Sequence, residues 1–446
     1  MTQPELNILP SEVAERAAST LATLRENYLA DSRAWVVAYS GGKDSTLLLQ
    51  LVYTMLIDLG KSAEKEVYVI SSDTQVEAPR IASHLHQTLS AISNDSKKRG
   101  LPLRCRLVCP RVDESFWAKL IGKGYPPPTR NFRWCTNNMK IKPARRSIAD
   151  IAARHGSVVL LLGSRLSESS ARRQRMEGRN QNFRGMNPHH DIPNAFVFTP
   201  IADWEIEEVW EYLLRGPQPP WGGDHNNLAE LYRDASGGEC PLVLDLTTPS
   251  CGGSRFGCWT CTVVKQDRSL QGFVDSGDDT LLPLVEYCQW LREIREDESR
   301  RLRHRRNGAP GPGPFDGRTR RELLQRLLEV EQRVGRLLVD DEVIKYIQSV
   351  WSKEIDLTES AIAIANTFGR ELVAERSDMA LNNEQRELLA EAAKEEGIDL
   401  ILLNRLLSLA DEFPDITVWG VKPQLRAKIK DIIEAAAGDD NGDDII

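Results

Sequence analysis

The 446-residue sequence predicts an α/β fold in which a parallel sheet carries helices on both faces, followed by an α-helical C-terminal region. In the first half, short unbroken apolar runs alternate with helical patterns, and such runs are typical of parallel strands buried on both faces. Clusters of Gly, Ser and Asp follow these runs, where ligands bind in such sheets. After about residue 281 the pattern is mainly helical.

These patterns predict the elements of the first 235 residues in order. Residues 1–30 are expected to form an amphipathic N-terminal helix, because Val13, Ala17, Leu21 and Leu24 fall near helical spacing. Residues 31–235 are expected to form the α/β domain. Its expected strands are 35–39, 67–70, 104–108, 158–162 and 196–198, and its expected helices are 46–59, 78–94 and 144–155.

Two further regions follow this domain. Residues 236–280 contain four cysteines and little periodicity. Residues 281–446 are expected to be helical, with a loop at 307–317 (NGAPGPGPFDG) and an acidic tail. The helices expected after that loop are 319–338, 342–355, 360–368, 383–396 and 399–409.

Composition limits the class of protein. Lys and Arg number 57 against 65 Asp and Glu, so the net charge is −8 and any nucleic-acid binding must rest on local basic patches. No apolar run is long enough to span a membrane, and no secretory signal is evident, so we expect a cytoplasmic protein with no membrane partner. In that compartment eight cysteines favour metal or redox chemistry over disulfides.

The strongest local motif is Ser40-Gly41-Gly42-Lys43-Asp44-Ser45, between an expected strand and an expected helix. Gly and Ser let the backbone approach an anion, and the helix N-terminus offers unpaired N–H groups. A diphosphate suits this loop, with Lys43 adding charge and Asp44 holding a cation or capping the helix. The sequence is not a Walker A loop, which argues against ordinary γ-phosphate hydrolysis. A plain glycine turn is the alternative.

Two arginine-rich tracts are candidate phosphate contacts. The first runs from Arg165 through Arg172 to Arg184; Arg165 and Arg172 favour a nucleotide, and the later arginines favour a nucleic-acid backbone. The second, 292–336, is densest at 300–306 and favours phosphate contact. The alternatives are a solvated loop for the first tract and a solvated helix with Glu/Arg pairs for the second.

Four cysteines have the spacing C-x10-C-x6-C-x2-C: Cys240, Cys251, Cys258 and Cys261. Four thiolates in a Gly-rich loop suit tetrahedral Zn²⁺ or a [4Fe–4S] cluster, and the spacing alone does not separate these two. Chance clustering of buried cysteines is the remaining alternative.

Cys135 lies apart from these four cysteines in the sequence. Its cationic neighbours Arg133, Lys140 and Lys142 are expected to lower its pKa and so make it a nucleophile or persulfide carrier. An inert buried thiol is the alternative.

The loop Ser40–Ser45 resembles the SGGxDS motif of the PP-loop ATP pyrophosphatases, which share an adenine nucleotide alpha hydrolase-like fold. Asp73-Thr74 resembles an Asp-Thr that the superfamily commonly has near the adenosine. Two further segments resemble the phosphoadenylyl-sulfate (PAPS) reductase branch: Gly163-Ser164-Arg165 with Arg172, and Pro200–Trp210. The resemblance implies that residues 31–235 form an ATP pyrophosphatase domain that transfers AMP and releases pyrophosphate with Mg²⁺. It implies ATP contacts from Ser40, Gly41, Gly42, Lys43, Asp44, Ser45, Asp73, Thr74, Gly163, Arg165 and Arg172.

The chain most resembles the DndC family of DNA phosphorothioation proteins, through RWCT with KIKP, GSRLSESSARR, and GCWTCTVVKQDRS at 257–269. The SspD type, from a single-strand version of the system, is similar enough to remain open. The resemblance implies DNA as substrate, catalytic roles for Lys43, Asp44 and Cys135, and a [4Fe–4S] cluster inserted at 236–280 on the four spaced cysteines. It also implies a cysteine desulfurase as sulfur donor and other phosphorothioation proteins as partners.

Three other functions remain as alternatives. A sulfonucleotide reductase would have a Cys-Cys dipeptide where this chain has Cys135-Thr136, and a catalytic cysteine near the C-terminus, whereas no cysteine follows Cys288. A tRNA thiolase shares the SGGxDS loop but lacks the later segments. A cluster-bearing DNA scaffold that senses ATP would keep the loop without turnover.

Overall fold

The computed structural model describes residues 9–168, 185–189, 191–235, 257–263, 268–306, 309–354, 360–373 and 383–398, with scattered positions between 402 and 433. The chain divides into two compact units. Unit 1 comprises Met1–Pro110 and Arg133–Leu282, and unit 2 comprises Arg111–Phe132 and Pro283–Ile446. This division lies near the expected boundary at 281, whereas residues 111–132, expected within the 31–235 domain, group with the C-terminal helices.

Unit 1 is built on one six-stranded sheet with the strand order β3-β2-β1-β4-β6-β5. The strands are β1 (Ala34–Ala38), β2 (Val67–Ser72), β3 (Leu103–Val108), β4 (Val158–Leu162), β5 (Asn187–Pro188) and β6 (Ala195–Phe198). Neighbours pair in parallel from β3 to β6, and among the described strands only the short edge strand β5 is antiparallel. The predicted parallel α/β fold is therefore confirmed. β5 was missed because two residues carry no periodicity.

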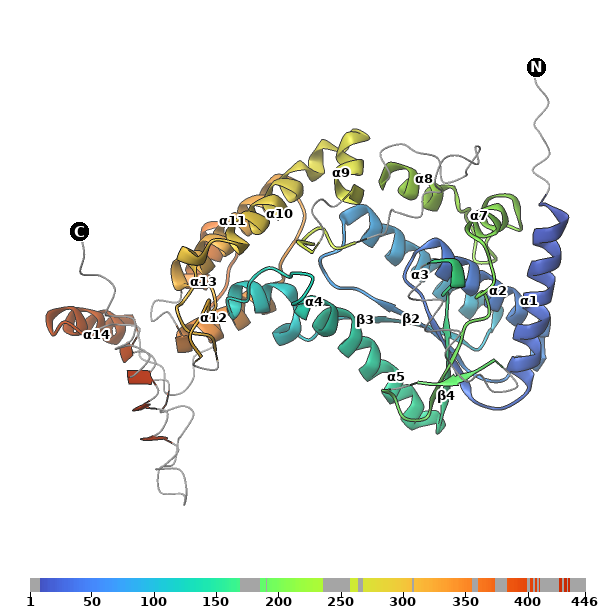
Figure 1. The fold of residues 1–446 in the computed structure, drawn as a ribbon, viewed down its shortest axis with the longest axis horizontal. Coiled ribbons are helices and arrows are strands. Elements are labelled where there is room, and N and C mark those ends of the chain that lie inside the picture. The colour runs from blue at the N-terminus through green and yellow to red at the C-terminus, as the bar shows by residue number, and fades with distance from the viewer. Residues whose placement is uncertain are drawn as a thin grey trace. The chain divides into compact units, whose positions relative to one another are not determined.

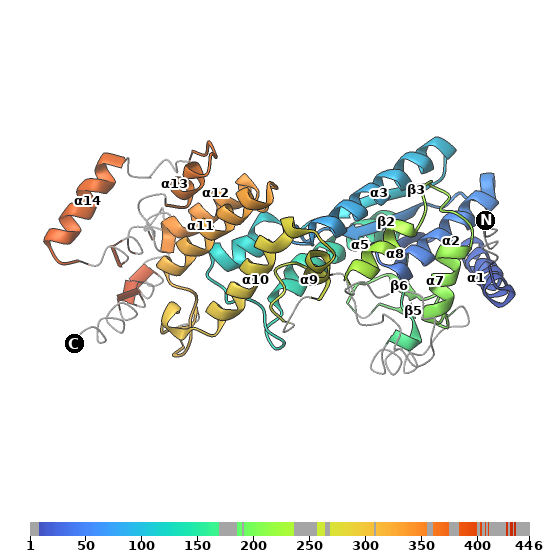
Figure 2. The same cartoon turned by 90° about the horizontal axis from the view of Figure 1, so that it is seen from above.

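Helices cover both faces of this sheet, as predicted (Figure 1). The described helices of unit 1 are α1 (Ser11–Leu29), α2 (Lys43–Leu59), α3 (Pro79–Arg99), α4 (Trp134–Thr136), α5 (Lys142–His155), α7 (Ile206–Arg215), α8 (Asn226–Ala235) and α9 (Arg268–Asp275). α1, α2, α3, α7 and α8 pack on one face, and Figure 2 shows α7 beside α1 and α2. α5 packs on the other face.

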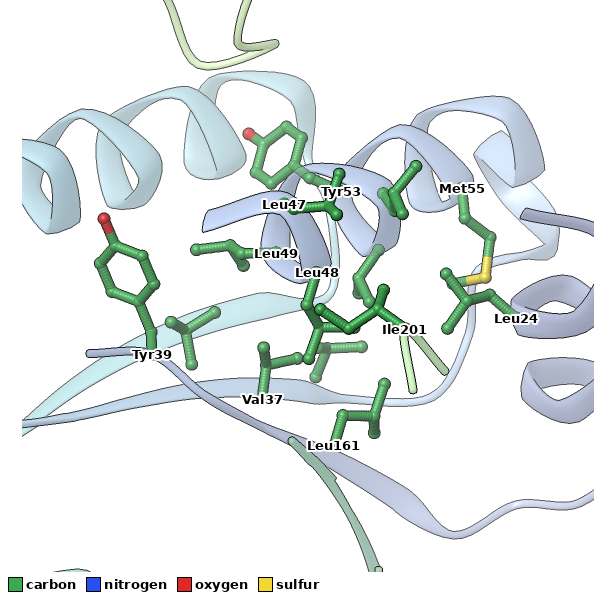
Figure 3. Close-up of a cluster of buried hydrophobic side chains, with 14 of the residues drawn as sticks. Leu24, Val37, Tyr39, Leu47, Leu48, Leu49, Tyr53, Met55, Leu161 and Ile201 are labelled. Carbon is green, nitrogen blue, oxygen red and sulfur yellow. The ribbon is translucent and has the colours of Figure 1, made fainter. Parts of the chain in front are cut away.

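Strand residues alternate between two apolar clusters, which explains why each strand is an unbroken apolar run. In β1, Trp35 and Val37 face the cluster under α2, while Val36 faces the cluster under α5. Figure 3 shows the first cluster, where Leu48 of α2 lies over Val37 of β1 and Leu161 of β4. Because both faces of the sheet are packed, each strand is held in place relative to its neighbours. The positions of the loops that follow the strands are fixed as a result.

The order of the strands creates one switch point. After β1 the chain adds β2 and β3 on one side, and then returns to add β4 on the other side of β1. Ala38 pairs with Leu162 at the carboxyl ends of these two strands. The loops beginning at Tyr39 and Gly163 therefore emerge side by side, which is where open α/β sheets bind ligands.

Unit 2 is helical in the part of it that the structure describes. Its helices are α10 (Leu282–Arg295), α11 (Gly317–Val334), α12 (Asp341–Glu354), α13 (Ser360–Thr367) and α14 (Asn383–Glu395). The last four match the expected helices at 319–338, 342–355, 360–368 and 383–396. The expected loop at 307–317 ends where α11 begins, and the Asp316 carboxylate caps α11 by accepting the Thr319 N–H at 2.6 Å. The expected helix at 399–409 lies largely outside the described residues.

Residues 111–132 pack among the helices of unit 2, with Phe116, Trp117, Leu120 and Ile121 buried. The Trp117 indole donates to the Leu338 carbonyl at 2.8 Å, and the Trp351 indole donates to the Ile121 carbonyl at 3.0 Å. The buried Arg320 guanidinium donates to the carbonyl of Gly122 as well as to Glu354. These contacts link positions far apart in the sequence, so periodicity did not reveal them. None of the described helices combines the length and apolar character needed to cross a bilayer.

Candidate nucleotide site and cysteine cluster

The loop between β1 and α2 forms a cradle at the carboxyl edge of the sheet. Gly41 has φ +76°, a conformation that favours glycine, and Gly42 is the N-cap of α2. The Ser45 hydroxyl closes the loop, since it donates to the Gly42 carbonyl at 2.8 Å and lies 3.2 Å from the Ser40 nitrogen, whose N–H it accepts. α2 therefore starts at Lys43, three residues earlier than expected, and directs its first-turn N–H groups at the mouth of the loop.

The Asp44 carboxylate lies between two cations. Its Oδ2 is 3.1 Å from Lys43 Nζ, and its Oδ1 is 2.7 Å from Nε of Arg165. Arg165 is only 3% exposed, and it also donates to the Ser167 hydroxyl at 2.9 Å and to the Trp204 carbonyl at 3.2 Å. Arg165 therefore connects the PP-loop to the segment after β4 and to the Trp204 segment.

Gly163 brings the backbones of these two loops together. A Cβ built on Gly163 would lie 2.8 Å from the carbonyl oxygen of Asp44 and 2.9 Å from the nitrogen of Ser45. No larger side chain fits there unless the backbone shifts. Position 163, where we expect an ATP contact, therefore also needs a glycine so that the two backbones can pack this closely.

Tyr232 on α8 supports the PP-loop from beneath. Its hydroxyl oxygen accepts the Lys43 N–H at 3.3 Å, and Lys43 Nζ lies 5.4 Å from its ring centroid. Burial raises the pKa of Tyr232, so the phenol stays protonated. Sequence analysis missed this role, because a tyrosine in an amphipathic helix is ordinarily a core residue.

These loops open on one pocket of about 980 Å³ within unit 1, at the upper end of the range for small-molecule sites. The expected residues that line it are Ser40, Gly42, Lys43, Asp44, Ser45, Gly163 and Arg165. Side chains that sequence analysis did not assign to a nucleotide also line it, including Glu77, Lys140, Arg145, Asp191 and Tyr232. Gly41, Asp73 and Thr74 are not among the lining residues.

Asp73 and Thr74 instead shape the loop after β2. The Asp73 carboxylate accepts the Gln75 N–H at 2.7 Å and lies 3.0 Å from His86 Nε2. The Thr74 N–H donates to the Glu77 carboxylate at 3.0 Å. Burial raises the pKa of Glu77, which faces the pocket.

The same loop holds the segment that contains Cys258. Glu77 and Cys258 form an isolated antiparallel bridge, and the Trp259 N–H donates to the Val76 carbonyl at 2.9 Å. The Thr74 hydroxyl lies 3.5 Å from Cys258 Sγ. Cys261 follows in a turn closed by its own N–H to the Cys258 carbonyl at 3.0 Å. The C-x2-C pair is therefore held beside the nucleotide pocket, of which Gly257 and Glu77 are lining residues.

Cys135 lies in the same neighbourhood, although it is more than a hundred residues away in sequence. The charges of Cys258, Cys135 and Cys261 all raise the pKa of Lys140, with Cys258 acting most strongly. Burial raises the pKa of Cys135, and the negative charge of a Cys261 thiolate adds to that effect. Burial also raises the pKa of Cys258, to about 12. The expectation that neighbouring cations depress the Cys135 pKa is therefore wrong.

Three expected site residues fall outside the described part of the chain: Cys240, Cys251 and Arg172. Among the described residues, no group of three or more His, Cys, Asp or Glu side chains could hold a metal ion. The four-cysteine ligand set thus stays a prediction.

The arginines expected to contact DNA in unit 2 have internal partners. Arg300 pairs with Glu322 at 2.6 Å, Arg306 pairs with Glu354 at 2.9 Å, and Arg301 donates to the Gly313 carbonyl. The segment 300–306 is not a helix apart from a short 3-10 turn that ends at Arg300. These pairs give this segment a structural role within unit 2.

Comparisons with known proteins address the family. The model of the phosphoadenosine phosphosulfate reductase domain matches residues 34–263. An uncharacterized protein of Methanocaldococcus jannaschii is 27% identical over 220 residues, which cover 49% of this chain and 38% of that protein. The chain therefore spans well under half the length of this relative.

Two solved structures are similar at low identity. PAPS reductase from Candida auris, in a phosphate complex, is 15% identical with a TM-score of 0.28, over 46% of this chain and 86% of that chain. FMN adenylyltransferase from Candida glabrata, with FMN and an ATP analogue, is 12% identical with a TM-score of 0.32, over 74% and 85%. The family model covers more than half of the sequence, including both the loop at Ser40–Ser45 and the Cys258–Cys261 turn, and the chain belongs to the phosphoadenosine phosphosulfate reductase domain family.

Proposed function

We propose that this protein modifies DNA with sulfur: it adenylylates a DNA phosphate oxygen with ATP, releases pyrophosphate, and then replaces that oxygen with sulfur. One observation carries the proposal. The C-x2-C turn at Cys258–Cys261 pairs with the loop after β2, and this loop borders the pocket of the PP-loop. Thiol chemistry and nucleotide chemistry thus share one site.

The first step is transfer of AMP. A non-bridging oxygen of the DNA phosphate attacks the α-phosphorus of ATP, and the bond to the β-phosphate oxygen breaks. The first-turn N–H groups of α2 and the Lys43 ammonium stabilise the departing pyrophosphate. Lys43 moves from Asp44 to the phosphates in this step. Mg²⁺, when bound, would be held by the Asp44 carboxylate and would neutralise charge on the leaving group.

The second step is displacement of AMP. The activated oxygen has become part of AMP, which is a far better leaving group than an oxide ion. A sulfur nucleophile attacks the DNA phosphorus, and the bond from phosphorus to the AMP oxygen breaks. A cysteine desulfurase supplies the sulfur in this proposal, and other proteins of the modification system are partners. The carrier is either the cluster or a Cys135 persulfide. With sulfide from the cluster, the phosphorothioate forms directly. With the persulfide, the attack leaves a Cys135–S–S–phosphorus linkage; a thiol such as free cysteine then attacks the Cys135 sulfur, the S–S bond breaks to release the phosphorothioate, and a second thiol reduces the mixed disulfide.

A [4Fe–4S] cluster fits the described part of the cysteine site. Cys258 and Cys261 lie on one tight turn, Gly257 precedes it, and the Lys140 side chain adds positive charge beside the thiols. Cys240 and Cys251 would complete the ligand set. When bound, the cluster would supply sulfide or electrons for the sulfur step.

The reductase alternative is weaker. The iron–sulfur type of sulfonucleotide reductase is expected to use a Cys-Cys dipeptide, and this chain has Cys135-Thr136 at that position. A pyrophosphate-release assay distinguishes the enzyme from the scaffold alternative, since a scaffold binds ATP without cleaving it.

Pyrophosphate release and sulfur incorporation test the proposal directly. Anaerobically purified protein with ATP, Mg²⁺, DNA, a cysteine desulfurase and cysteine is expected to release pyrophosphate and to form nuclease-resistant phosphorothioate linkages. Asp44→Asn is expected to abolish both products. Asp58→Asn is the matched control, because Asp58 is an exposed carboxylate at the other end of α2 and outside the pocket lining, and this variant should retain most turnover. Orthophosphate as the primary product, or adenosine 3′,5′-bisphosphate release from PAPS, would contradict it.

A further inference from the structure

We propose that the cationic segment Arg133–Arg146 is the surface that binds the DNA backbone. This inference rests on the proposed function and assigns its macromolecular partner to a particular face. Between positions 133 and 149 the chain has five cations, Arg133, Lys140, Lys142, Arg145 and Arg146, and no Asp or Glu. That bias stands out in a protein whose net charge is −8.

The segment is one continuous helical stretch. α4 ends at Thr136, a π-helical turn covers Asn137–Ile141, and α5 begins at Lys142, with right-handed helical dihedrals at each junction. From position 133 to position 145 this stretch advances roughly 18 Å, about the length of five nucleotides along one DNA strand. The spacing suits a backbone contact over several phosphates rather than a single small anion.

This stretch forms part of the pocket wall. Lys140, Ile141 and Arg145 line the nucleotide pocket, while Arg133 precedes the helix and is exposed. The chain runs down α5 to His155 and then into β4, so the start of α5 lies at the carboxyl edge of the sheet, as the PP-loop does. A strand lying along this wall can place one phosphate in the pocket.

Helix stability does not explain these charges. The stretch begins at Trp134, and its first turn contains no acidic residue and has no side-chain cap. A cation near a helix N-terminus opposes the macrodipole, so Arg133 at the N-cap costs rather than gains helix stability. An exposed isoleucine, Ile141 at 49%, lies between Lys140 and Lys142 and offers an apolar contact to a sugar or base.

On the PP-loop side of the pocket, two cations share one carboxylate. Lys43 and Arg165 both pair with Asp44, which offsets part of their positive charge. The opposite wall carries Lys140 and Arg145, and Arg145 donates to the Asp191 main-chain carbonyl rather than to a carboxylate. Cations therefore lie on two sides of a pocket whose lining also includes the acidic residues Asp44, Glu77, Asp191, Glu205 and Glu207. In this proposal the PP-loop side takes the phosphates of ATP, and the Lys140 side takes the phosphate that accepts AMP.

Charge reversal tests this surface. The variant is Arg133→Glu with Lys142→Glu, and the matched control is Lys97→Glu with Lys98→Glu. Both pairs change the net charge equally, and Lys97 and Lys98 lie at the end of α3, on the edge of the sheet where β3 begins. Binding of a short fluorescein-labelled DNA is measured by anisotropy across a salt series without ATP. Thermal unfolding and ATP binding are measured on every protein, and Arg133→Gln with Lys142→Gln serves as a milder second variant.

The reversal is expected to weaken DNA binding by at least about tenfold and to lower the salt slope by about 2, while the control pair changes neither. The Gln pair should show a smaller loss in the same direction with an unchanged melting temperature. Equal losses in variant and control, or full DNA affinity in the Arg133/Lys142 variants, would overturn the inference. Failure of the proposed function would appear separately, as DNA binding through this face without pyrophosphate release or sulfur incorporation.

Discussion

Nε of Arg165 lies 2.7 Å from Oδ1 of Asp44, and this ion pair joins two loops that are 121 residues apart. Arg165 is almost completely buried, so the pair is screened little by solvent. Its remaining contacts, to Ser167 and to the Trp204 carbonyl, fix the guanidinium from behind. Asp44 is therefore held at a set position before any nucleotide arrives.

Replacing Arg165 with Ala should destabilise unit 1 by about 3 kcal/mol, because it leaves a partly buried carboxylate with only Lys43 as partner. ATP turnover should fall as well, since Asp44 loses its fixed orientation. Urea unfolding and pyrophosphate release measure the two effects.

Arg104→Ala is the control for this change. Arg104 pairs with Glu66 on the same sheet, but its side chain is 68% exposed, so its loss should cost less than about 1 kcal/mol. Equal destabilisation by the two variants would contradict the assigned role of Arg165.

Gly163→Ala should weaken ATP binding at least about tenfold, because the new Cβ would lie under 3 Å from the backbone of Asp44 and Ser45 and must displace the PP-loop. Isothermal titration with a non-hydrolysable ATP analogue measures the effect. Gly122→Ala in unit 2 is the control, since its Cβ would meet Ile347 no closer than 3.4 Å. Unchanged ATP affinity in Gly163→Ala would show that the two backbones can separate without cost.

The sequence predicted the parallel sheet and the PP-loop because both are local patterns. Apolar runs such as Val158–Leu162 predict strands, and the composition of Ser40–Ser45 predicts an anion-binding turn. One small error also has a local cause. The helix expected from residue 46 begins at Lys43, because the Ser45 hydroxyl donates to the Gly42 carbonyl and completes the first turn of α2.

Long-range relationships were beyond the sequence. Tyr232, Arg165 and Asp44 meet only because β4 returns beside β1 and α8 packs under the loop. Likewise Cys135 and Cys261 become neighbours through tertiary packing, and burial then reverses the direction expected for the Cys135 pKa. Desolvation depends on how many atoms surround a thiol, which neighbouring residues in sequence do not reveal.

Cys258→Ser and Cys261→Ser should each remove most of the iron and acid-labile sulfide from anaerobically prepared protein, which is otherwise expected to hold about four irons per chain. Cys135→Ser should keep the iron and abolish sulfur incorporation if Cys135 carries a persulfide. Cys105→Ser on β3 is the control and should change neither property. Stoichiometric zinc without labile sulfide would remove the cluster proposal, and loss of iron in Cys135→Ser would make Cys135 a ligand.

The buried His225 side chain should make the free energy of unfolding depend on pH, and this effect does not involve the proposed iron–sulfur cluster. The pKa of His225 is lowered to about 4, chiefly by burial and also by the nearby His84, while Asp224 opposes the shift. Its Nε2 lies 2.6 Å from Oε1 of Gln50, whose amide donates to the Pro217 carbonyl, so the neutral ring anchors the loop after α7 to α2.

Between about pH 4 and pH 6.5 the unfolded chain binds a proton at His225 and the folded chain does not. The free energy of unfolding should therefore be highest above pH 6.5 and should fall by up to about 3 kcal/mol as the pH drops to 4. His225→Gln removes this titration, so its curve of unfolding free energy against pH should be flatter than that of the wild type in this window. Urea unfolding across the window measures both curves. Parallel curves for the two proteins would show that His225 is protonated in the folded state and that the Gln50 contact does not require a neutral ring.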